Sequence, residues 1–125
     1  MLNVGVDIIE LSRINQVLER WGASFLNRIY TEKEQEYCRG RIPQLAARFA
    51  AKEAVMKALG TGIRGVGWKD IEVTRQRGSA PQISLHNRAT LRAEKIGVLQ
   101  VALSLSHSRD YAVASVVMNV DENSN

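Results

Sequence analysis

The order of apolar and polar residues changes its period several times along the chain. Alternation with period two predicts strands, and apolar residues three to four positions apart predict amphipathic helices. The expected strands are 3–9, 70–74, 82–85, 100–106 and 111–117. The expected helices are 10–21, 31–38, 43–59 and 87–96. Helices and antiparallel strands in mixed order indicate an α+β fold, in which an antiparallel sheet is packed with helices.

Local signals at the ends of these segments support the assignment. Thr31 and Glu34 have the spacing of a capping box at the start of a short helix. Asn87 is expected to cap the helix that follows it. Residues 60–67 hold four glycines and are expected to form a loop. The short connection 108–110 makes the last two strands an antiparallel hairpin.

Length and composition limit the class of protein. The chain has 125 residues, which suits a single domain over residues 1–120 with a frayed polar tail at 121–125. No apolar run approaches the roughly 20 residues that a membrane-spanning helix needs. No export signal precedes the first strand, so a cytoplasmic location without membrane contact is expected. Cys38 is the only cysteine, which excludes an internal disulfide and a cysteine-based zinc site.

Positive charge is concentrated in the middle of the chain. The formal net charge is +4, but residues 39–95 carry twelve Lys or Arg against four acids, a local charge of +8. Such a field favours an anionic partner, which charge alone does not identify. Aromatic residues are only 6% and do not interleave with the basic ones, which argues against nucleic acid. A non-enzymatic domain that binds an acidic protein or nucleic acid through residues 39–95 and an ordinary solvated basic face both stay open at this point.

Four residues on two elements could form a site for a phosphorylated ligand. Glu53 and Lys57 are four apart and share a face of the long helix, while Asp7 lies on the face of the first strand opposite its valines. If the fold brings Asp7 near Glu53, the two carboxylates could share Mg²⁺, which fills its shell with water and phosphate oxygens. Lys57 and Arg48 could then meet the remaining phosphate charge. A structural cluster of ion pairs is the alternative.

Three motifs follow one another along most of the chain. They are Gly5-Val6-Asp7-Ile8-Ile9-Glu10, then Arg48-Phe49-Ala50-Ala51-Lys52-Glu53-Ala54 with Lys57-Ala58-Leu59-Gly60, and finally Leu105-Ser106-His107-Ser108 with Tyr111-Ala112. In order and spacing they resemble the holo-[acyl-carrier-protein] synthases, the small bacterial-type 4′-phosphopantetheinyl transferases. The resemblance implies that fold and a Mg²⁺-dependent transfer of 4′-phosphopantetheine from coenzyme A to a serine of apo acyl carrier protein. The implied second product is adenosine 3′,5′-bisphosphate, and the implied role is fatty acid biosynthesis.

The same resemblance assigns the catalytic residues. Asp7 and Glu53 are expected to hold Mg²⁺, and Lys57 is expected to stabilise the phosphate oxygens. The base that takes the serine proton stays open among Asp7, Glu53 and a metal-bound water. In the larger type of transferase an additional acid stands where this chain has Ile9, so two protein carboxylates are expected on the metal.

Binding residues follow from the resemblance in the same way. Arg48, Gly60 and His107 are expected to line the coenzyme A site together with Lys57. The individual phosphate contacts are interchangeable among four basic side chains, Arg48, Lys52, Lys57 and Arg64. The carrier protein is acidic and is expected to dock on the exposed face of the first helix, through Arg13, Gln16 and Arg20. The resemblance further implies a homotrimer with active sites between subunits.

Overall fold

The long strands near the two ends of the chain meet in one antiparallel sheet. The computed structural model describes residues 1–122, and the sheet has the order β1 (Leu2–Glu10), β5 (Tyr111–Val120), β4 (Val98–His107). In the register, Asp7 lies opposite Ala114, which in turn lies opposite Leu105. β1 and β4 are therefore the two edges of this sheet.

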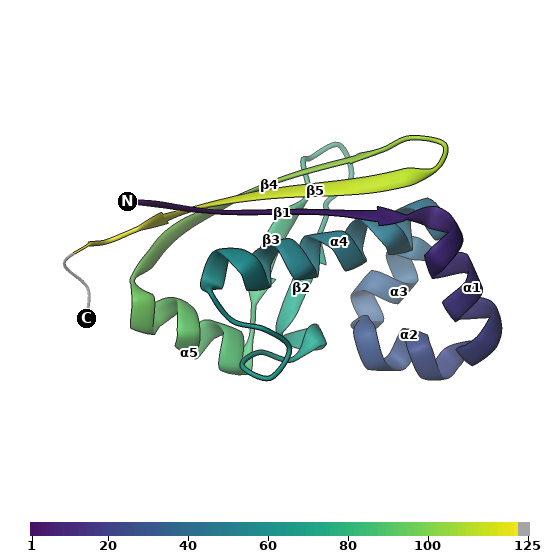
Figure 1. Cartoon of the computed structure of the whole chain (residues 1–125), viewed down its shortest axis with the longest axis horizontal. Coiled ribbons are helices and arrows are strands. Elements are labelled where there is room, and N and C mark those ends of the chain that lie inside the picture. The colour runs from purple at the N-terminus through teal and green to yellow at the C-terminus, as the bar shows by residue number, and fades with distance from the viewer. Residues whose placement is uncertain (123–125) are drawn as a thin grey trace.

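One helix, α4 (Ile42–Leu59), packs against a single face of the sheet (Figure 1). Its contact surface consists largely of small side chains, which let a helix approach a sheet closely. Gly5 of β1 is the point of closest approach. A Cβ there would lie 2.8 Å from the carbonyl carbon of Ala54 and closer still to its oxygen. Because only glycine fits, this residue sets the distance between β1 and α4.

Two groups of elements flank α4. The first comprises three helices, α1 (Leu11–Trp21), α2 (Ala23–Ile29) and α3 (Glu32–Cys38). The second comprises the 3-10 turn η1 (Trp68–Asp70), the hairpin β2 (Ile71–Thr74) and β3 (Gln82–Leu85), and α5 (Asn87–Ile96). Figure 1 shows the three helices at one end of the molecule and α5 at the other.

The other face of the three-stranded sheet is not covered by any element of residues 1–122 (Figure 1). Val4, Val6 and Ile8 of β1 lie on it and are 57%, 51% and 60% exposed. Gly5, Asp7 and Ile9 alternate with them and lie on the opposite face, as the sequence predicted, and the structure shows that this face packs against α4. A row of exposed β-branched side chains on an open sheet face is typical of a surface that another chain covers.

The α+β class and all five expected strands are confirmed, and so are the four expected helices. The Thr31–Glu34 capping box is present. α2 and η1 were not expected. The prediction that Asn87 caps α5 is wrong, because Asn87 is the first residue of the helix and donates from Nδ2 to Asp70 Oδ1 at 3.3 Å. Its φ of 48° places it in the left-handed region, which asparagine tolerates.

Three smaller observations complete the comparison with the sequence. Within residues 1–122, every helix is too short or too polar to cross a bilayer. Burial raises the pKa of the Cys38 thiol to about 11, so this cysteine is a packed side chain and a poor nucleophile at neutral pH. β5 extends to Val120, and most of the tail expected at 121–125, namely residues 123–125, lies outside the described residues.

Candidate functional site

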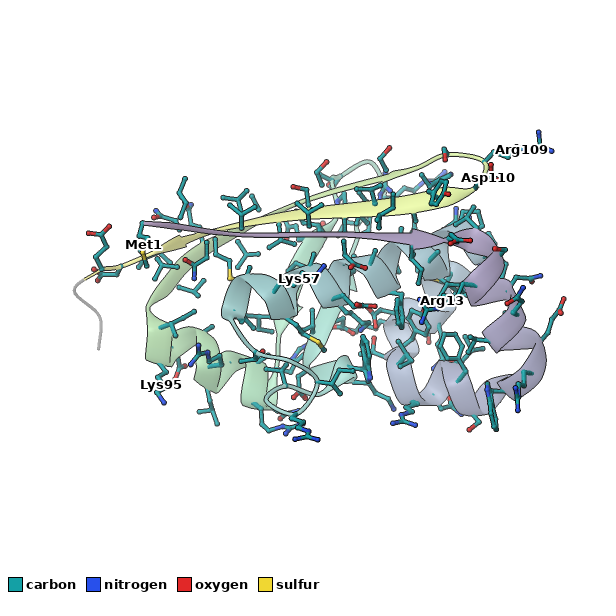
Figure 2. All side chains as sticks on the ribbon, in the orientation of Figure 1. Met1, Arg13, Lys57, Lys95, Arg109 and Asp110 are labelled. Atoms are coloured by element: carbon teal, nitrogen blue, oxygen red, sulfur yellow. The ribbon has the colours of Figure 1, made fainter. Side chains whose placement is uncertain are left out.

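The first cluster of functional side chains joins β1 to α4. The Nζ of Lys57 donates to Asp7 Oδ1 and to the backbone oxygen of Val6, both at 2.9 Å. The Asp7 side chain is 14% exposed and that of Lys57 is 54% exposed, so the pair opens to solvent on the lysine side. Figure 2 shows Lys57 at the junction of β1 and α4. Lys57 pairs with Asp7 rather than with its helical neighbour Glu53.

Glu53 is the second carboxylate of this cluster. Burial raises the pKa of its carboxyl group above the ordinary value, and the negative charge of Asp7 raises it further, while Lys57 and Arg13 act in the opposite direction. The fold therefore brings Asp7 and Glu53 close enough to repel each other. A site that holds two carboxylates together at this cost favours a bound cation.

The donor set fits a hard cation. Mg²⁺ typically takes one or two protein carboxylates and completes its octahedron with water and phosphate oxygens. In the described part of the chain, no group of three or more His, Cys, Asp or Glu side chains could hold a metal alone. Asp7 and Glu53 would thus bind Mg²⁺ together with a phosphorylated substrate, rather than in a closed site of protein ligands.

A second cluster lies at the edge of the sheet formed by β4. Arg48 of α4 and His107 at the end of β4 line the same pocket of about 300 Å³. Arg48 is 3% exposed, and its Cζ lies 4.1 Å from the ring centroid of Tyr37. Its Nη1 donates to the Gln44 oxygen at 3.4 Å, but its Nε is buried without a hydrogen-bond partner. An arginine this buried and this poorly paired favours an anionic ligand.

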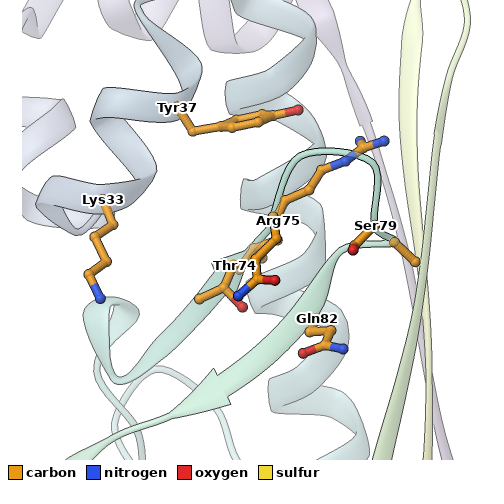
Figure 3. A pocket seen from close by; sticks show the side chains of 9 residues that line it. Lys33, Tyr37, Thr74, Arg75, Ser79 and Gln82 are labelled. Atoms are coloured by element: carbon orange, nitrogen blue, oxygen red, sulfur yellow. The ribbon is translucent and has the colours of Figure 1, made fainter.

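A neighbouring pocket of about 450 Å³ continues from this cluster, because Tyr37 and Arg75 line both. Figure 3 shows it between α3 and the β2–β3 hairpin, with the Tyr37 ring on one side and polar side chains on the other. Lys33 and Arg75 give it positive charge, and Tyr37 gives it an aromatic surface. The combined space therefore suits a ligand with an aromatic ring and phosphate groups.

The two clusters lie on opposite flanks of α4. Arg48 and Glu53 are five residues apart, which separates their directions by about 140° around the helix axis. Asp7 and His107 lie on the two edge strands, which are about 10 Å apart across the sheet. The structure thus brings together Asp7, Glu53 and Lys57, and separately Arg48 and His107. Gly60 lies in neither: it ends α4 in the left-handed conformation, at φ 74°.

An apolar groove of about 490 Å³ lies between α1, α2 and α4. Ile9, Phe49, Ile63 and Trp68 line it. Arg13 of α1, labelled in Figure 2, also lines it and is close enough to Glu53 to lower the pKa of that carboxyl group. The other two residues of the expected docking face lie on α1 next to this groove. These are Gln16, which is exposed, and Arg20, whose Cζ lies 5.1 Å from the Trp21 ring centroid.

Lys52 does not reach any of these sites. Its side chain is fully buried, and its Nζ donates to Glu34 Oε1 at 2.7 Å. It is therefore removed from the four basic side chains proposed for phosphate contact. Sequence spacing could not separate it from Lys57, because Lys52 follows Arg48 and Lys57 follows Glu53 at the same interval of four on one helix.

Comparison with known proteins decides the family. The sequence profile of the family described as "4'-phosphopantetheinyl transferase superfamily" matches residues 3–116. The chain belongs to this family. It is 53% identical to the holo-[acyl-carrier-protein] synthase of Gloeobacter violaceus, over 90% of this chain and 89% of the other. It is 48% identical to the holo-[acyl-carrier-protein] synthase of Koribacter versatilis, over 94% of this chain and 98% of the other.

Solved structures of the same family share the fold. The holo-[acyl-carrier-protein] synthase of Helicobacter pylori in complex with coenzyme A superposes with a TM-score of 0.84, at 30% identity, over 93% of this chain and 99% of that chain. The holo-[acyl-carrier-protein] synthase of Neisseria meningitidis superposes with a TM-score of 0.85, at 35% identity, over 94% of this chain and 97% of that chain. Within this fold, sequence reasoning missed Gly5, Tyr37 and Arg75. Gly5 alone had a signal, because a glycine inside a β-branched strand often marks a close backbone approach.

Proposed function

We propose that this chain is a Mg²⁺-dependent holo-[acyl-carrier-protein] synthase. It would transfer 4′-phosphopantetheine from coenzyme A to a serine of apo acyl carrier protein and release adenosine 3′,5′-bisphosphate. The carrier proteins of fatty acid biosynthesis are the expected acceptors. The observation that carries the proposal is the cluster in which Asp7 meets Lys57 across 50 residues of chain and lies beside Glu53. Family membership and relatives of that name support it.

The cluster suits nucleophilic attack at phosphorus. Asp7 and Glu53 would hold Mg²⁺, and the bound cation supplies neutralisation of the charge on the pyrophosphate. An ammonium group has three N–H donors, and Lys57 uses two of them on Asp7 and Val6. The third is free to donate to a phosphate oxygen, where negative charge grows in the transition state.

In the transfer step, the serine Oγ forms a bond to the phosphorus that carries the pantetheine arm. The bond from that phosphorus to the bridging oxygen breaks, and the electron pair leaves with adenosine 3′,5′-bisphosphate. The serine proton must pass to a base. The candidates at this cluster are Asp7, Glu53 and a metal-bound water.

The second cluster suits the nucleotide half of coenzyme A. Arg48 and His107 would meet phosphate charge, and the neighbouring pocket of Figure 3 offers Tyr37 and Arg75 to the purine and its surroundings. Complexes of relatives such as the Helicobacter pylori protein with coenzyme A support this ligand. Gly60, which lies in neither cluster, would contribute only backbone at the end of α4.

The separation of the two clusters supports a homotrimer with active sites between subunits. Coenzyme A needs both clusters, but α4 lies between them in one chain. A head-to-tail ring would place the β4 flank of one subunit against the β1 flank of the next. The uncovered row Val4, Val6 and Ile8 supplies apolar surface for such an assembly. A V6E variant should then form monomers in light scattering; a V6E trimer would exclude this sheet face as the interface.

The apolar groove and the α1 face suit the carrier protein. The cations Arg13 and Arg20 lie beside apolar side chains, a combination that fits an acidic partner with an apolar anchor. Because Arg13 adjoins both the groove and Glu53, a protein docked there would present its serine to the acid–lysine cluster. The expected salt dependence of docking follows from screening of the arginines.

The decisive experiment is the intact mass of an apo acyl carrier protein after incubation with the enzyme, coenzyme A and Mg²⁺. We expect a gain of one phosphopantetheine group, which EDTA abolishes. E53A should lose the transfer, and E94A, which removes an exposed acid of α5, is the matched control. No mass gain with any of several carrier proteins would contradict the proposal, provided that the enzyme is folded.

A further inference from the structure

Lys52 is the most deeply paired cation of the described chain. Its side chain is 0% exposed, and each of its three N–H donors has an acceptor. The acceptors are Glu34 Oε1 at 2.7 Å, the Trp68 oxygen at 3.0 Å and the Ile71 oxygen at 2.5 Å. One side chain of α4 thus holds α3 on one side and the segment 68–71 on the other.

The segment that Lys52 holds forms one wall of the apolar groove. The Trp68 ring stacks on Phe49, with ring centroids 5.0 Å apart and an interplanar angle of 24°. Both rings line the groove, and Phe49 lies one helical turn before Lys52 on α4. The carbonyl bonds from Lys52 therefore fix the backbone on which the Trp68 ring stands.

We propose that Lys52 is a positioning residue for carrier-protein docking, acting through Trp68; the kinetic consequence rests on the function proposed above. Lys52 contacts no solvent-exposed ligand site itself. Neither Lys52 nor Trp68 lines the Arg48–His107 pocket or the neighbouring pocket of Figure 3. Loss of the Lys52 amine should therefore weaken the use of the carrier protein and leave the use of coenzyme A unchanged.

Glu34 has a separable task, which provides the matched control. Its Oε1 accepts from the Thr31 amide at 2.9 Å and its Oε2 accepts from the Val73 amide at 2.9 Å. It caps α3 and ties that helix to β2, but it does not touch the Trp68 segment. In E34Q a neutral or charged Lys52 amine still has N–H donors for the Trp68 and Ile71 oxygens. E34Q and E34Q/K52M then differ only in this amine, and neither leaves a buried carboxylate unpaired.

The first test follows the Trp68 ring directly and needs no activity. The chain has two tryptophans, so a W21F background leaves Trp68 as the only indole reporter. We expect acrylamide to quench Trp68 about twofold more strongly in W21F/E34Q/K52M than in W21F/E34Q, because a released ring is more accessible to solvent. Equal quenching in the two variants would overturn the positioning role.

The second test compares Michaelis constants with Trp21 present. We expect the KM for apo acyl carrier protein to rise about tenfold from E34Q to E34Q/K52M, with the KM for coenzyme A within about twofold. A purely structural role would lower kcat through loss of folded enzyme and move neither KM, which overturns the proposal. A wild-type enzyme without transfer activity contradicts the proposed function, while the quenching result still decides whether Lys52 positions Trp68. If E34Q/K52M does not fold, E34Q/K52L, which also lacks an N–H donor, takes its place in both tests.

Discussion

Two lysine–carboxylate pairs on α4 have nearly the same length and opposite consequences. The pair Lys57–Asp7 measures 2.9 Å and is half open to water, whereas Lys52–Glu34 measures 2.7 Å and is fully buried. The buried pair has used all three lysine donors, so it can only hold the fold together. The open pair keeps one donor free beside a second carboxylate, Glu53. Unsatisfied binding capacity, rather than distance, therefore marks the pair that can act on a substrate.

The largest effect is expected from the open cluster. D7A or E53A removes one of the two carboxylates available to Mg²⁺, so transfer should fall by about a thousandfold or more while the protein stays folded. The assay is holo carrier protein formed per unit time, with circular dichroism for the fold and E94A as control. A variant that keeps near wild-type transfer would remove its carboxylate from the metal site.

The free energy of unfolding tests the contrast between the two pairs most directly. K52M leaves Glu34 buried without its cation and should lower the free energy of unfolding by about 3–5 kcal/mol. K57M removes a half-exposed partner and should change it by less than about 1 kcal/mol. Urea denaturation of both variants gives the two values. Equal losses would show that the open pair also supports the fold.

These opposite roles show which features of the fold the sequence alone could predict. Periodicity found every strand and the long helices, because burial of one face leaves a repeating pattern. It missed α2 (Ala23–Ile29) and η1, which have only seven and three residues and are too short to show a clear period. The capping box at Thr31 was readable because its bonds are local, whereas Asn87 was misassigned because its amide bonds to the distant Asp70.

Only those site residues that belong to a sequence motif could be predicted. Asp7, Glu53 and Lys57 could be named, but their meeting depends on Gly5, whose missing side chain lets β1 touch α4. Lys52 and Lys57 could not be distinguished from the sequence, because the burial of each side chain depends on how the helix packs. The division into two clusters on the flanks of α4 also lies outside the sequence, because it follows from the strand order β1-β5-β4.

A smaller effect should separate the two flanks kinetically. R48M removes the poorly paired buried guanidinium beside His107, so the KM for coenzyme A should rise about tenfold or more, with the KM for the carrier protein unchanged. R13A lies at the groove and should show the reverse, a carrier-protein KM that rises several-fold and converges with wild type as salt increases. If both variants raise the same KM, the flanks serve one substrate and the division is wrong.

The smallest effect concerns the pKa of Glu53 in the metal-free protein. Burial is its main cause and Asp7 the second, so the D7N substitution should bring the pKa of Glu53 part of the way back to its ordinary value. K57M should move it the other way, because Lys57 opposes the increase. The measurement is a carbon-detected NMR titration of the Glu53 carboxyl. An identical pKa in D7N would mean that the two carboxylates do not interact.

This titration also bears on activity. Glu53 must be ionised to hold Mg²⁺, and its raised pKa places the loss of transfer at a higher pH than an ordinary glutamate would. As the pH falls, protons and Mg²⁺ then compete for the same carboxyl group. Raising the Mg²⁺ concentration should therefore shift the acid limb of the transfer rate to lower pH. An acid limb that does not move with Mg²⁺ would assign it to a group outside the Asp7–Glu53 cluster.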